Sequence, residues 1–134
     1  MVEIKNNFKT LKWGIVGCIV TILILTVLEF PAPIGFESRP QNNVSMGWLF
    51  FFLTIVITEI ATIPLIIKKT SLGAKFGIIA GILNILQIIA DQLHLMQPEV
   101  APLGYTLLEY TVGVVALFLI VLSIKLNYDK ESFN

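Results

Sequence analysis

Four polar side chains interrupt an otherwise apolar stretch in the second half of the chain. These residues are Asn84, Gln87, Asp91 and His94, and successive members are three, four and three positions apart. Helical residues three or four positions apart share a face, so this spacing predicts one polar stripe along a helix. Amide, carboxylate and imidazole groups can bind ligands through hydrogen bonds, and the last two can also exchange protons. The spacing therefore predicts a face with binding or proton-carrying chemistry.

Two further carboxylates lie within other apolar runs. Glu59 is near the middle of one run, and Glu109 is near the beginning of another. A charged side chain at the centre of a bilayer costs at least ~2.5 kcal/mol, so these groups should face other helices and not lipid. We therefore predict an outward-facing polar pocket inside the membrane. Its ligand-binding or proton-carrying residues are Glu59, Asp91, His94 and Glu109, with Asn84 and Gln87 beneath them.

The composition indicates which elements must position these groups. The chain is 56% hydrophobic and only 13% charged, whereas about a quarter of the residues in a soluble domain are charged. Four apolar runs are long enough to cross about 30 Å of hydrocarbon as helices, and they cover residues 11–30, 48–67, 76–95 and 102–126. We predict an all-α integral membrane four-helix bundle with antiparallel neighbours, forming a single membrane domain over residues 1–134.

The distribution of positive charge predicts the topology. Lysines precede the first span, occupy the expected loop at 68–75 and follow the last span. The outer loop at 31–47 has Arg39 as its single positively charged residue. The positive-inside rule therefore predicts a multi-pass plasma-membrane protein with both termini in the cytoplasm. No basic cluster is large or aromatic enough to suggest nucleic-acid binding.

Three glycines in the third span are spaced four residues apart, at Gly73, Gly77 and Gly81. Small residues at this spacing allow membrane helices to approach closely and pack by van der Waals contact. We therefore expect tight packing near the lysine-rich ends of the helices and a more open polar region towards the opposite side.

Three segments resemble a known group of proteins. They read EIATIPLIIKK at 59–69, GAKFGIIAGILNI at 73–85 and LLEYTVGVVALFLI at 107–120. These segments are similar to small prokaryotic four-helix membrane proteins of the broad DoxX-like type. The resemblance implies a four-helix membrane bundle without an agreed activity, and it places emphasis on the acidic positions Glu59 and Glu109.

The leading functional hypothesis is non-enzymatic. The pocket would bind a small lipophilic or cationic molecule or a partner subunit, within the lipid bilayer and as a homodimer or an accessory subunit of a membrane complex. The alternatives are a proton-coupled small-molecule transporter, a membrane-embedded acid–base enzyme acting on a lipid-like substrate, and a purely structural polar core. We assign no catalytic residue and no cofactor. A chain with one histidine lacks the ligands of a di-metal bundle, and we predict no metal site.

Overall fold

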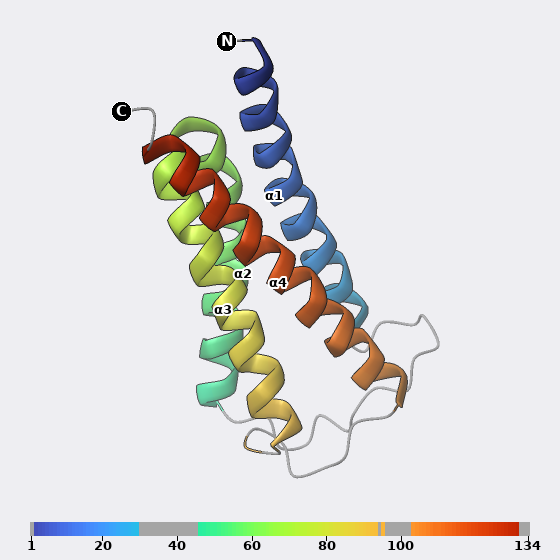
Figure 1. Ribbon diagram of the computed structural model, residues 1–134. Coiled ribbons are helices and arrows are strands. Elements are labelled where there is room, and N and C mark those ends of the chain that lie inside the picture. Colours follow the sequence, from blue (N-terminus) through green and yellow to red (C-terminus); the bar gives the residue numbers. More distant parts are fainter. Residues whose placement is uncertain (1, 30–45, 94, 96–102, 132–134) are drawn as a thin grey trace.

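Four helices make up the computed structural model, which describes residues 2–29, 46–93, 95 and 103–131. The helices are α1 (Val2–Glu29), α2 (Met46–Lys68), α3 (Thr70–Gln92) and α4 (Leu103–Glu131). They run side by side as an elongated bundle (Figure 1). The predicted all-α four-helix bundle is confirmed.

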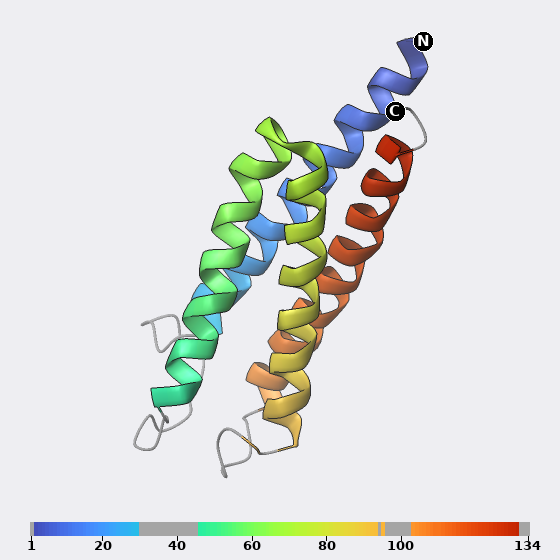
Figure 2. The ribbon, with the colours of Figure 1, turned by 90° about the vertical axis from the view of Figure 1, so that its left-hand side faces the viewer.

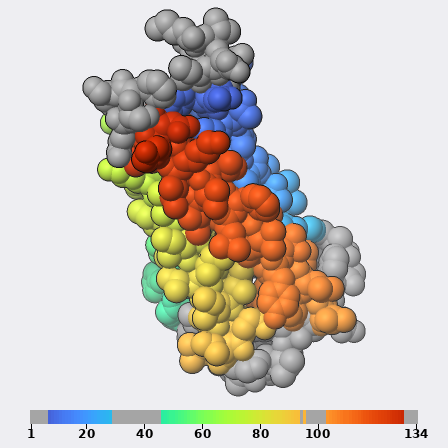
Figure 3. All heavy atoms as spheres, viewed as in Figure 1, coloured from blue at the N-terminus to red at the C-terminus, as the bar shows by residue number. Residues whose placement is uncertain are grey.

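The helices pack in a definite order. α3 lies between α2 and α4, and α4 also packs along α1. α1 and α2 have the least contact of these neighbouring pairs, and Figure 2 shows the arrangement from the side. The space-filling view shows α4 crossing one face of the molecule, with α3 on one side and α1 on the other (Figure 3).

The α2–α3 turn lies at the same end of the bundle as the beginning of α1 and the end of α4 (Figure 1). We call this the lysine end, because it contains Lys9, Lys12, Lys68, Lys69, Lys75 and Lys125. The opposite end, where α1 and α3 finish and α2 and α4 begin, is called the far end.

Each helix separates an inward face from an outward apolar face. On α3, the exposed side chains include Ile79, Ile82, Leu86 and Ile89, whereas Asn84 is buried. An outer surface of large aliphatic side chains suits a lipid environment, because no hydrophobic driving force buries apolar side chains there. All four helices are long and apolar enough to cross a membrane, and the chain is a multi-pass membrane protein on that basis.

The structure corrects the loop expected at 68–75. Only Lys69 separates α2 from α3, and Lys75 lies on α3 itself. The backbone remains hydrogen-bonded through the turn, since the Lys69 amide donates to the Leu65 carbonyl at 2.7 Å and the Gly73 amide donates to the Lys69 carbonyl at 2.9 Å. Residues 70–75 contain no proline that would prevent helix formation. Their polar side chains are explained by a position at the membrane surface. The outer loop expected at 31–47 falls largely at 30–45, outside the described residues.

The glycine row forms close contacts with two helices. A Cβ atom on Gly73 would meet the backbone of Leu65 and Ile66 on α2. A Cβ atom on Gly77 would meet the Ser123 side chain on α4, and one on Gly81 would lie 3.0 Å from the Ala116 carbonyl oxygen on that helix. The predicted role of these glycines in tight helix packing is confirmed, with α3 as the helix that joins α2 to α4.

The substitution Gly73→Ala tests this packing. Its new methyl group would lie 2.6 Å from the Leu65 carbonyl carbon, and backbone atoms cannot rotate away as a flexible side chain does. We expect the free energy of unfolding in detergent to fall by about 1–3 kcal/mol, the usual cost of overpacking. Gly17→Ala is the matched control because nothing lies within 4 Å of its added Cβ. Equal stability of the two variants, measured by denaturant-induced loss of helix, would contradict the packing described.

Candidate functional site

A carboxyl group and an amide meet in the middle of the bundle. Glu59 on α2 and Asn84 on α3 are 0% and 2% exposed, respectively. The Asn84 Nδ2 atom donates to Glu59 Oε1 at 2.6 Å and also to the Ala80 carbonyl oxygen at 2.9 Å. The second bond fixes the amide against its own helix, so that it presents a donor to α2. The expected inward orientation of both residues is confirmed.

The second oxygen of the Glu59 carboxyl group has no such donor. Within the described part of the chain, Glu59 Oε2 is buried and accepts no hydrogen bond. The neighbouring buried hydroxyl of Thr62 donates to the Thr58 carbonyl oxygen of its own helix at 2.7 Å, and its proton is therefore already used. A buried polar atom without a partner costs free energy, and buried polar groups in native proteins are almost always paired. Glu59 Oε2 is thus an acceptor available to a binding partner.

A second amide–carboxyl pair lies closer to the far end. The Gln92 Nε2 atom on α3 donates to Glu109 Oε2 on α4 at 2.7 Å. Gln92 follows Asn84 by eight residues, which corresponds to about 12 Å along the helix axis. Asp91, adjacent to Gln92, is also buried. The polar interior therefore contains two separate levels, one joining α2 to α3 and one joining α3 to α4.

The structure places four of the six predicted site residues at these two levels. Glu59 and Asn84 form the middle level. Glu109 and the buried Asp91 belong to the second level. Gln87 lies between the two levels on α3 and is partly exposed. His94 lies outside the described residues. Residues 30–45 and 96–102 are also outside the described part of the chain, so the outward-facing pocket stays a prediction.

The sequence reasoning missed two interior polar residues, Gln92, which is partly buried, and Ser123, which is fully buried. Gln92 follows Asn84 by eight residues, which is twice the four-residue spacing of positions that share a helix face. Applying that spacing from Asn84 would have identified it. Ser123 is fully buried on α4 against Gly77, and among the described residues its hydroxyl oxygen has no hydrogen-bond partner. The only sequence signal for Ser123 was that a single serine interrupts this apolar run.

The carboxylates do not assemble as metal ligands where the structure describes them. No group of three His, Cys, Asp or Glu side chains in the described ranges is arranged to hold a metal ion. The chemistry available at the middle level is therefore acceptance of a hydrogen bond or of a positive charge by Glu59, with Asn84 holding the other carboxyl oxygen in place.

Comparison with known proteins adds no family assignment. No family model matches the chain, and neither the curated proteins nor the solved structures compared with it give a match. The functional argument therefore depends on the residues of this chain alone.

The substitution Asn84→Leu tests the middle level. It removes the donor to Glu59 Oε1 and leaves a buried carboxyl group without any partner among the described residues. We expect the free energy of unfolding to fall by about 1–3 kcal/mol. Gln92→Leu is the matched control, since its bond to Glu109 is only partly buried and should contribute about 0.5–1 kcal/mol. Titration with a denaturing detergent, followed by loss of helix, measures both; an unchanged midpoint for Asn84→Leu would rule out the bond as a stabilising contact.

Proposed function

We propose that this chain is a small-molecule-binding protein of the plasma membrane, with both termini in the cytoplasm and Glu59 as the group that recognises the ligand. The observation that carries the proposal is the unpartnered Glu59 Oε2 atom, buried midway through the bundle. Ionisable residues within membrane spans are costly and commonly mark binding sites or ion pathways.

The chemistry of the site favours a lipophilic cation, or a neutral molecule with a strong hydrogen-bond donor. Asn84 already occupies Glu59 Oε1, and the remaining oxygen offers an acceptor in surroundings from which water is largely excluded. A charge-assisted hydrogen bond to a carboxylate is about twice as strong as a neutral one. The remainder of the ligand should be apolar, because the core of the bundle is formed mainly by Ile, Leu and Ala side chains.

Access to Glu59 requires two helices to separate, because its side chain is fully buried. The pair best suited to this movement is α1 and α2, which have the least contact among the neighbouring helices. The chain between them runs through residues 30–45, whereas a single residue connects α2 to α3. A molecule dissolved in the bilayer would thus enter laterally between α1 and α2. Bundle interiors are common positions for ligand sites.

Two alternatives use the same carboxyl group. A proton-coupled transporter needs an acidic residue in mid-membrane, and the position of Glu59 near the middle of α2 favours this class over an enzyme. An accessory subunit would instead use the far end and the lipid-facing surface to contact a partner or a second copy of this chain. In that arrangement Glu59 would contribute to the assembly only through its bond to Asn84.

Binding of tetraphenylphosphonium, a lipophilic cation, tests the proposal. We expect the purified protein in detergent to bind it, and Glu59→Gln to weaken binding by about 10–100-fold, because a charged partner in a dry site is lost. Glutamine keeps an acceptor for Asn84, so the fold should be retained. The measurement is equilibrium dialysis of the wild type and the variant.

Two controls make the result specific. Triphenylphosphine oxide, an uncharged molecule of similar shape, should bind weakly and equally to both proteins. Glu109→Gln should have less effect than Glu59→Gln, since Glu109 belongs to the separate second level, where it pairs with Gln92. Equal affinity of Glu59→Gln and the wild type for tetraphenylphosphonium would refute the proposal. Release of protons on binding, absent in Glu59→Gln, would assign the transporter alternative.

A further inference from the structure

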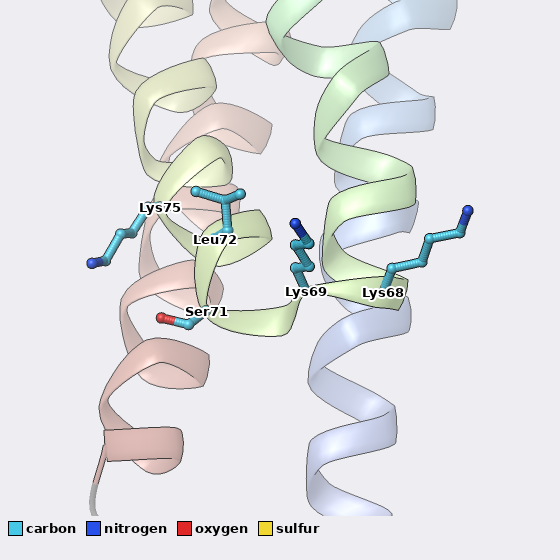
Figure 4. Close-up of a pocket in the computed structure, with 5 residues that line it drawn as sticks. All are labelled: Lys68, Lys69, Ser71, Leu72 and Lys75. Atoms are coloured by element: carbon cyan, nitrogen blue, oxygen red, sulfur yellow. The ribbon is translucent and has the colours of Figure 1, made fainter.

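A separate feature lies at the lysine end, away from the polar interior. A groove of about 460 Å³ runs beside the α2–α3 turn, and it is lined by Lys68, Lys69, Ser71, Leu72 and Lys75. Figure 4 shows Lys69 between α2 and α3, with its ammonium group directed back along the helices and Leu72 on the same side. Lys68 and Lys75 extend to either side of it. The groove is therefore basic at its rim and apolar at Leu72.

No carboxylate that the structure describes neutralises the positive charge in this groove. Within the described ranges, no carboxylate forms an ion pair with Lys68, Lys69 or Lys75. Ser71 is held against α4, since its hydroxyl donates to Asn127 Oδ1 at 3.1 Å. The wall of the groove is thus fixed, and three cations remain available to an anion from outside.

We propose that this groove binds the headgroup phosphate of an anionic phospholipid. The turn lies at the end of two membrane-spanning helices, at the depth where phospholipid headgroups are found. Clusters of lysine beside membrane helices attract anionic lipids, and basic pockets between helices bind their headgroups.

The apolar side of the groove distinguishes a lipid from a free phosphate ion. Leu72 lines the groove, and its apolar side chain is exposed there. An acyl chain leaving a headgroup held by the lysines would lie along this surface, in the direction towards which the Lys69 side chain points (Figure 4). The ligand class is therefore a phosphate ester carrying acyl chains.

Native mass spectrometry of the full-length protein tests this site. The protein is released from detergent after incubation with equal amounts of phosphatidylglycerol and phosphatidylcholine that have identical acyl chains. We expect the wild type to retain phosphatidylglycerol in preference. Replacing all three groove lysines with glutamine should weaken its binding by roughly 100-fold, or about five-fold for each lysine.

A charge-matched triple variant controls for general electrostatic attraction. Lys9→Gln, Lys12→Gln and Lys125→Gln remove the same charge from the same end of the bundle, and this variant should keep the preference. Both triple variants are compared by helical content to verify folding. Equal losses in the two variants would overturn the proposal by showing diffuse attraction only. Displacement of the lipid by glycerol 1-phosphate at equal concentration would also overturn it, because the site would then be one for free phosphate.

Discussion

The hydrogen bond between Glu59 and Asn84 is the constraint around which the interior of this bundle is organised. It joins α2 to α3 at mid-membrane through two fully or almost fully buried side chains. In hydrocarbon neither group has water as an alternative partner, so each fixes the rotation of the helix that carries it. The outward rows of isoleucine and leucine on α3 follow from this rotation, because residues opposite the stripe must face lipid.

The bundle combines tight and incomplete packing. The glycines of α3 bring it against α2 at one end and against α4 along its middle, which leaves little freedom in those two contacts. α1 instead depends on α4 for most of its packing. The contact between α1 and α2 is therefore the least extensive of the contacts between neighbouring helices. Glu59, the proposed ligand-recognising group, belongs to α2, which α1 contacts less than it contacts α4.

The middle level of the site was predictable from the sequence, whereas the pairing at the second level was not. A polar residue in a membrane helix has very few permitted directions, and this made the inward position of Asn84 and Glu59 predictable from spacing alone. Spacing does not determine which partner each carboxyl group finds across helices. Gln92, which was not among the predicted site residues, donates a hydrogen bond to Glu109 across α3 and α4. Lys75 was placed in a loop because polarity at a membrane surface resembles polarity in a turn.

Solid-state NMR of the protein in lipid bilayers tests the central claim most directly. The dipolar coupling between the side-chain carboxyl carbon of Glu59 and the side-chain nitrogen of Asn84 reports their separation. The 2.6 Å hydrogen bond places these two atoms within about 4 Å of each other, given ordinary hydrogen-bond geometry. The account predicts a clear coupling at that distance. Absence of the coupling, with both residues visible and the helices intact, would contradict it.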